Sequence, residues 1–210
     1  MPHDSADHAA IVVEDDAGNI EAQIIVDALQ EVLIAKGFLT AREVTATIAR
    51  LESPGIHQGA EIVAKAWTEP NFKTQLMSDG RAAIQSLGMA VTEARIILVE
   101  NTADQHHLIT CTLCSCYPRS ILGQPTSWYI SKAYRARSVR EPRKVSHEFG
   151  LYLPTDMQLT VHDSNAGMRY LVLPQMPQWA HGFGAEALKA MITRDHLIGV
   201  ARDFVQSKPA

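Results

Sequence analysis

Residues 95–116 read RIILVENTADQHHLITCTLCSC, and the character of the chain changes across this stretch. The run 95–99 is rich in β-branched residues and predicts a strand. The shorter run 107–110 predicts a second extended segment, which leads directly into Cys111. Helical patterns dominate before residue 94, whereas strands and helices alternate after it. The sequence therefore predicts an α+β fold in which a helical N-terminal half precedes a mixed domain.

The N-terminal half divides into a tail and a series of helices. Residues 1–20 are polar, lack a sustained hydrophobic period and predict a mobile tail. Residues 21–90 predict a helical arm, in which Thr40 and Glu43 form a capping-box pattern and Gly37 stands where a helix would end. Nothing in the arm suggests chemistry.

Residues 91–210 predict an α+β catalytic domain built around the cysteine loop. The expected helices cover residues 125–139, 142–150 and 185–192. The expected strands cover residues 159–162 and 169–173, joined by a turn at 163–167, and a last strand covers 197–200.

The composition excludes several classes of protein. Apolar residues make up 46% of the 210 residues, enough for a core, and the net charge of −4 argues against a partner that is a nucleic acid or an anionic membrane. No run of about 18 apolar residues predicts a membrane span. The sequence begins MPHDS, without a basic and then apolar signal, which favours a cytoplasmic location.

Cys111, Cys114 and Cys116 are the only cysteines, and they lie too close together for a disulfide framework. A dithiol redox pair would leave Cys116 unexplained. A structural zinc site, or a metal-handling module, would need a fourth ligand such as His106 or His107. The remaining interpretation is a compact claw of thiolates, with peptide nitrogens between them, around a low-spin transition metal.

The segment 111–118, CTLCSCYP, closely resembles the metal-binding loop of nitrile hydratase α subunits. The resemblance spans roughly residues 22–200 and includes YRAR at 134–137, VREPR at 139–143, EFGL at 148–151 and RYLVLP at 169–174. It implies a helical arm followed by a layered α/β/β/α metal-binding domain. It also implies an enzyme that hydrates a nitrile to the amide at a trivalent metal, which acts as a Lewis acid.

The resemblance assigns roles to the loop residues. Cys111, Cys114 and Cys116 would provide sulfur ligands, and the backbone nitrogens of Ser115 and Cys116 two more. Cys114 would be oxidised to sulfinate and Cys116 to sulfenate, so that Cys114, Ser115 and Cys116 also form the catalytic centre. Thr112 and Tyr117 match the cobalt-type members, which implies one Co(III) ion in preference to iron(III).

The resemblance also implies partners for the chain. A separate β-type subunit would form a hetero-oligomer and contribute two arginines to the oxidised cysteines. A metallochaperone is a further candidate partner. Asp163 and Arg169 would support the claw from outside, and Tyr117 would face the substrate pocket.

Three departures from the family pattern bear on the substrate. Arg119 stands where nitrile hydratases usually carry Trp, as it does in the γ subunit of the related thiocyanate hydrolase, which forms carbonyl sulfide and ammonia. Gly167 replaces a usual Glu, and residues 178–182 replace a Gly-Thr-Glu-like turn with a segment that contains His181. Because a guanidinium beside the metal suits an anion, thiocyanate is the alternative substrate, with Arg119 in its pocket.

Overall fold

The computed structural model of the chain describes residues 17–114 and 116–204. The helices are α1 (Ala17–Ala35), α2 (Ala41–Glu52), α3 (Ile56–Thr68), α4 (Pro70–Ser78), α5 (Gly80–Gln85), α6 (Arg119–Leu122), α7 (Ser127–Ile130), α8 (Lys132–Arg140), α9 (Pro142–Glu148), the 3-10 helix η2 (Gln178–Ala180), α10 (Ala185–Met191) and α11 (Arg194–Ile198). The strands are β1 (Ile96–Glu100), β2 (Gln105–Thr110), β3 (Gln158–Asp163) and β4 (Arg169–Leu173). The tail expected over residues 1–20 falls largely outside the described residues, and α1 begins at Ala17.

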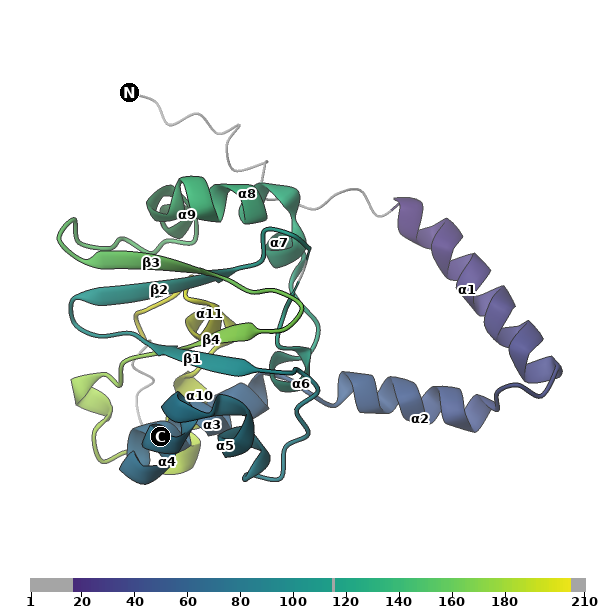
Figure 1. The fold of residues 1–210 in the computed structure, drawn as a ribbon, viewed down its shortest axis with the longest axis horizontal. Coiled ribbons are helices and arrows are strands. Elements are labelled where there is room, and N and C mark those ends of the chain that lie inside the picture. The colour runs from purple at the N-terminus through teal and green to yellow at the C-terminus, as the bar shows by residue number, and fades with distance from the viewer. Residues whose placement is uncertain (1–16, 115, 205–210) are drawn as a thin grey trace.

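The strands form two parallel pairs. β1 pairs with β4 and β2 pairs with β3, and Figure 1 shows β2 and β4 next to each other between the outer strands. The turn between β3 and β4 therefore does not close a hairpin, although Asn165 and Met168 form an isolated antiparallel bridge. In the β2–β3 pair, Thr110 lies opposite Asp163. This register brings the end of β3 to the start of the cysteine loop.

Helices cover both outer sides of the strand layers, as the family resemblance implied. α8 packs against β2 and α9 against β3, whereas α4 and α5 pack against β1 on the opposite side (Figure 1). The two strand pairs meet through β2 and β4, and their buried residues, such as Leu108 and Leu171, join one core. The α+β class and the layered α/β/β/α arrangement are confirmed.

The predicted helical arm, residues 21–90, contains most of α1 and all of α2 to α5. α3, α4 and α5 bury Val63, Leu76 and Ile84 in the core and so form part of the layered body. Only α1 and α2 project from it, as Figure 1 shows. All residues of α2 are described and none is buried, and its Thr40–Glu43 capping box is present. α4 and α5 pack on β1, whereas α3 packs on α4, α6 and α10, so the apolar faces of all three helices are covered.

The prediction of a last strand at 197–200 was wrong, because this segment forms α11 and its C-terminal cap. The Thr193 backbone N–H donates to the His196 Nδ1 atom at 3.0 Å at the helix start, and Gly199 ends the helix with φ of 86°. A Cβ atom at Gly199 would lie 1.9 Å from the His107 carbonyl oxygen, so only glycine fits. These two end signals outweigh the β propensity of four apolar or small residues.

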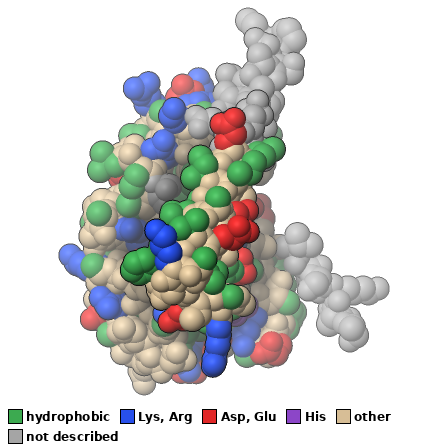
Figure 2. Space-filling view, turned by 90° about the vertical axis from the view of Figure 1, so that its right-hand side faces the viewer, with side chains coloured by type: hydrophobic (Ala, Val, Ile, Leu, Met, Phe, Trp, Pro, Cys, Tyr) green, Lys and Arg blue, Asp and Glu red, His purple; other side chains and the backbone are tan. Residues whose placement is uncertain are grey.

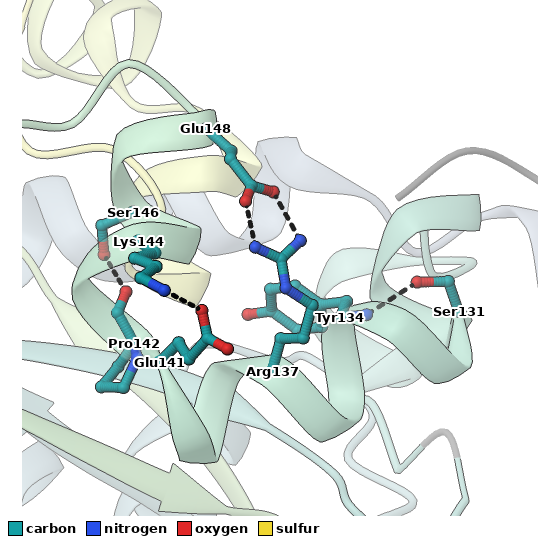
Figure 3. Close-up of polar contacts among 8 residues, drawn as sticks. All are labelled: Ser131, Tyr134, Arg137, Glu141, Pro142, Lys144, Ser146 and Glu148. Carbon is teal, nitrogen blue, oxygen red and sulfur yellow. Dashed lines mark hydrogen bonds and ion pairs between the residues drawn. The ribbon is translucent and has the colours of Figure 1, made fainter. Parts of the chain in front are cut away.

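A network of charged and polar groups joins α8 to α9 (Figure 3). Arg137 and Glu148 form a bidentate ion pair with one N–O distance of 3.0 Å, and Lys144 pairs with Glu141 at 2.9 Å. The Ser131 hydroxyl caps α8 by accepting from the Tyr134 backbone N–H at 3.1 Å. The Arg137–Glu148 pair is the strongest of these contacts, because its side chains are largely shielded from water. It fixes α8, which supports the cysteine loop.

His106 links β2 to the end of α11 inside the core. Its Nδ1 atom lies 3.1 Å from the Asn101 side-chain nitrogen, and its Nε2 atom lies 2.8 Å from the Gly199 carbonyl oxygen. The side chain is fully buried, and burial lowers the pKa of His106 to about 4 from its ordinary value of 6.5, although the Gly199 hydrogen bond acts in the opposite direction. The imidazole is therefore neutral in the folded protein at pH 7.

We expect His106 to make the protein sensitive to acid. Because the unfolded chain binds this proton near pH 6.5 and the folded chain only near pH 4, stability is complete above about 6.5 and falls between these values. The loss from this group amounts to about 3 kcal/mol. Urea unfolding from pH 7 to pH 4 should show the stability difference between wild type and His106→Gln shrinking by that amount. An unchanged stability difference over this pH range would contradict the expectation.

Among the residues that the structure describes, no helix combines the length and apolar character needed to cross a bilayer.

Candidate metal centre

The three cysteines converge where β2 ends. Their sulfur atoms all lie within 4.8 Å of one another, with Cys111 and Cys114 separated by 3.6 Å and Cys114 and Cys116 by 3.1 Å. Cys111 and Cys116 are buried, whereas Cys114 is exposed. The Cys114 backbone N–H donates to the Cys111 sulfur at 3.4 Å, which tightens the turn. The loop thus presents three soft donors on one side.

Buried aromatic side chains hold the backbone of the loop. The Tyr129 hydroxyl donates to the Cys116 carbonyl oxygen at 2.9 Å, and the Tyr134 hydroxyl donates to the Ile109 carbonyl oxygen at 2.7 Å. Both rings are essentially inaccessible to solvent. The Tyr117 ring packs edge-on against Tyr129 at a centroid distance of 4.9 Å. The two carbonyls lie at opposite ends of the cysteine loop, at Ile109 before it and at Cys116 where it ends. Helices α7 and α8, which carry the two tyrosines, therefore fix both ends of the loop.

Asp163 supports the loop from β3. Its two carboxylate oxygens accept from the Thr112 backbone N–H at 2.9 Å and from the Thr112 hydroxyl at 2.5 Å. Arg169 does not pair with Asp163 but donates to the carbonyl oxygens of Asn165 and Met168. Asp163 and Arg169 therefore act on different segments, the first on the cysteine loop and the second on the turn before β4.

We expect Asp163→Asn to weaken metal retention. An amide can accept only on its oxygen, so one of the two Thr112 contacts is lost and the loop gains freedom. Loss of an outer contact of this kind typically costs roughly 10- to 100-fold in metal affinity. Metal content per chain after dialysis against a chelator measures the effect. The exposed Asp156, changed to Asn, is the matched control, and equal metal content in both variants would contradict the expectation.

A cleft of about 540 Å³ opens over the cysteines. The cysteines that line it are Cys114 and Cys116, and its other walls come from residues 92–94, Tyr117, Arg119, Ala166 and Arg169. The Tyr117 hydroxyl and the Arg169 Nε atom are buried without a hydrogen-bond partner among the described residues. The cleft therefore combines two cysteine side chains with two arginine side chains.

The electrostatics of Cys116 disfavour a free thiolate nucleophile. Burial raises the pKa of its thiol to about 12, with contributions from the Cys114 and Cys111 sulfurs, whereas the Arg169 charge acts in the opposite direction. A thiol with such a pKa stays protonated at neutral pH unless a cation displaces the proton. The donor set, three adjacent sulfurs, suits a soft or borderline transition metal. The residues present therefore fit such an ion.

The histidines considered as a fourth zinc ligand are engaged elsewhere. Both ring nitrogens of His106 contact Asn101 and Gly199, and the His107 Nδ1 atom lies 2.9 Å from the His162 Nε2 atom. Neither belongs to the ligand cluster found among the described residues. This geometry disfavours a four-ligand zinc site made by the cysteines and either histidine.

The structure brings together most of the residues singled out in the sequence. Tyr117, Arg119 and Arg169 line the cysteine cleft, and Asp163 contacts the loop. Ser115 lies outside the described residues, so its backbone nitrogen remains a sequence-based prediction. His181 is exposed. The residue that sequence reasoning missed is Glu93, a wall of the cleft, because a lone acidic residue between a helix and a strand carries no local signal.

Comparison with known proteins gives consistent matches over most of the chain. The family model described as nitrile hydratase, alpha chain, matches residues 20–201. The cobalt-containing nitrile hydratase subunit alpha of Pseudonocardia thermophila is 42% identical over 178 residues, which cover 83% of this chain and 87% of that protein. The thiocyanate hydrolase subunit gamma of Thiobacillus thioparus is 38% identical over 191 residues, covering 85% of this chain and 79% of that protein.

A solved structure supports the same comparison. A double mutant of the Fe-type nitrile hydratase from Comamonas testosteroni Ni1 superposes with a TM-score of 0.81 at 40% sequence identity. The match covers 90% of this chain and 92% of that chain. The similarity therefore extends through the cysteine loop and the layered body together.

Proposed function

This chain belongs to the nitrile hydratase α-chain family, and from that premise we propose that it is the metal-holding subunit of a cobalt-type nitrile hydratase. The reaction would be the addition of water to a nitrile to give the amide. The observation that carries the proposal is the cluster of three sulfurs within 4.8 Å of one another, of which Cys114 and Cys116 line a cleft. Cobalt-containing relatives at 38 to 42% identity support the choice of metal.

The metal ligands in this proposal are Cys111, Cys114, Cys116 and the backbone nitrogens of Ser115 and Cys116. A trivalent cobalt ion bound there would supply Lewis-acid polarisation of the C≡N bond. Oxidation of Cys114 to sulfinate and of Cys116 to sulfenate is part of the proposal. Arg169 is suited to such oxygens, because its charge already favours the anionic form of Cys116 and its Nε atom has no partner among the described residues.

The side chains around the metal centre would bind and orient the substrate. Tyr117 closes one wall of the cleft and is held edge-on by Tyr129. Arg119 stands at the exposed part of the cleft, where it would meet the substrate as it enters. Asp163 would keep the loop in one conformation through Thr112, so that the catalytic sulfur groups need not reorganise during the reaction.

Thiocyanate hydrolysis is the second candidate function, and Arg119 favours it. A guanidinium in the cleft, close to Arg169, stabilises an anion more than a neutral nitrile. The 38% identical relative, a thiocyanate hydrolase γ subunit, supports this alternative.

A partner chain is also proposed, because α1 carries apolar side chains that the described residues leave exposed. Ile24, Ile25 and Leu29 are each more than half exposed, and Figure 2 shows apolar side chains among acidic ones on this side of the molecule. Apolar patches of this kind commonly mark protein interfaces. We infer that a separate β-type subunit covers α1 and forms a hetero-oligomer with the chain.

The test is made on the purified complex from co-expression with a β-type subunit. We expect one cobalt ion per chain, about three added oxygen atoms by intact mass, located on Cys114 and Cys116, and conversion of acrylonitrile to its amide. Formation of carbonyl sulfide and ammonia from thiocyanate, without nitrile hydration, would select the second candidate. Zinc together with unmodified thiols in an active sample would remove both.

A further inference from the structure

Glu93 is a buried acid in the wall of the cysteine cleft. Its side chain lies in the segment before β1 and is 8% exposed. The Ser120 backbone N–H donates to one carboxylate oxygen at 3.1 Å, and the Ser120 hydroxyl donates to the other. The Thr92 hydroxyl adds a longer contact of 3.4 Å. All three partners are neutral groups, and two of them belong to the residue directly after Arg119.

The Glu93 carboxylate caps helix α6, which has no side-chain cap from the residue directly before it. α6 starts at Arg119, and Pro118 before it offers no side-chain cap. The N–H groups at a helix start need acceptors, and a negative charge there is favoured. Ser120 itself is buried, so water cannot easily replace Glu93 as the acceptor. Glu93 therefore fixes the first turn of α6 from a distance of 27 residues along the chain.

The position of Arg119 depends on this backbone. Its own N–H donates to the Tyr117 carbonyl oxygen at 2.9 Å, and its carbonyl accepts from Gly123 at 3.0 Å. No ion pair among the described residues holds its guanidinium. Hydrogen bonds hold only the main chain of Arg119. The contact between Glu93 and Ser120 therefore determines the position of the Arg119 backbone, from which the exposed side chain extends.

We propose that Glu93 is a positioning residue, which holds the turn 118–120 so that the Arg119 guanidinium stays at the cleft and favours an anionic substrate. The proposal rests on the proposed function in that Arg119 meets the substrate. It assigns Glu93 no proton transfer, because its oxygens are occupied by Ser120 and Thr92.

The experiment compares Glu93→Ala, Glu93→Gln and Ser120→Ala in the hetero-oligomeric holoenzyme. Hydrogen exchange of the Ser120 amide, followed by mass spectrometry of the peptide, should be at least about tenfold faster in Glu93→Ala, because a hydrogen bond to a charged acceptor is lost. Glu93→Gln keeps one oxygen acceptor but replaces the other oxygen by an amide nitrogen, so its exchange rate should lie between those of the wild type and Glu93→Ala. Ser120→Ala keeps the N–H contact and should show a smaller increase at position 120. Glu186→Gln, on the exposed side of α10, is the matched control.

The second readout is substrate preference. The ratio of kcat/KM for thiocyanate to that for acrylonitrile should fall about three- to tenfold in Glu93→Ala, through the KM for thiocyanate, and recover in part in Glu93→Gln. If the wild type does not turn over thiocyanate, the thiocyanate Kd from calorimetric titration replaces KM. Turnover of neither substrate would contradict the proposed function. Unchanged Ser120 exchange in Glu93→Ala, or an unchanged thiocyanate affinity despite faster exchange, would overturn the proposal. A hundredfold loss of kcat in Glu93→Gln would instead assign proton transfer to Glu93.

Discussion

Replacing any one of Cys111, Cys114 and Cys116 by serine is expected to remove the bound metal and lower kcat/KM by at least about a thousandfold. A hydroxyl is a harder and far less acidic donor than a thiol, so it does not replace a thiolate on a soft or borderline ion. The three sulfurs lie within 4.8 Å of one another, and loss of one leaves the cluster incomplete. Metal content per chain and steady-state kinetics measure the effect.

The cysteine variants differ in what they do to the fold. Cys111 is fully buried, and a serine hydroxyl there, if left unpaired, would cost about 1–3 kcal/mol of stability. Cys114 is exposed, so Cys114→Ser separates ligand loss from loss of packing. Leu113→Ala in the same loop is the matched control, because the Leu113 side chain is 81% exposed and offers no ligand atom. Wild-type metal content in Cys114→Ser would refute the three-sulfur site.

Arg119→Trp is expected to change the substrate preference by roughly 10- to 100-fold in favour of neutral nitriles. A charge-assisted contact is worth about 1.5–3 kcal/mol, and the substitution removes it while adding an aromatic wall to the cleft. Thiocyanate turnover should fall, and bulky apolar nitriles should be hydrated better. The ratio of kcat/KM for thiocyanate to that for acrylonitrile and a bulkier nitrile measures the shift.

A second variant, Arg119→Lys, separates charge from shape. It keeps a cation at the rim of the cleft but loses the planar fork of donors, so the ratio should lie between those of the wild type and Arg119→Trp. If both activities fall together with subunit association, Arg119 belongs to an interface. If the ratio does not change, Arg119 takes no part in substrate choice.

Much of the architecture could be predicted because its signals are local. Thr40 and Glu43 are three residues apart and predicted a capping box, which the structure contains. The β-branched run at residues 95–99 predicted β1 to within one residue. The cysteine cluster could also be recognised, since its donors lie within six consecutive residues. In each case the interacting groups are neighbours in the chain, so short spacing is sufficient information.

Sequence-based predictions were wrong or missing where contacts between segments distant in the chain determine the local structure. Residues 197–200 resemble a strand in isolation, but the close approach of Gly199 to the His107 carbonyl favours a helix end there. A helical pattern likewise does not reveal that α3 packs on α6 and α10, whereas α2 has no buried residue. Here tertiary packing overrides local propensity.

The clustered cysteines and the order of most helices and strands could be predicted from the sequence, because residue types and short spacings specify them. The folded structure, in contrast, brings Asp163 to Thr112, places Arg119 and Arg169 in one cleft and brings Glu93 to Ser120. The hydrogen bonds from Thr112 to Asp163 and from Ser120 to Glu93 join residues that are 51 and 27 positions apart in the chain. Their formation depends on strand register and on the packing of α6, which no local pattern encodes.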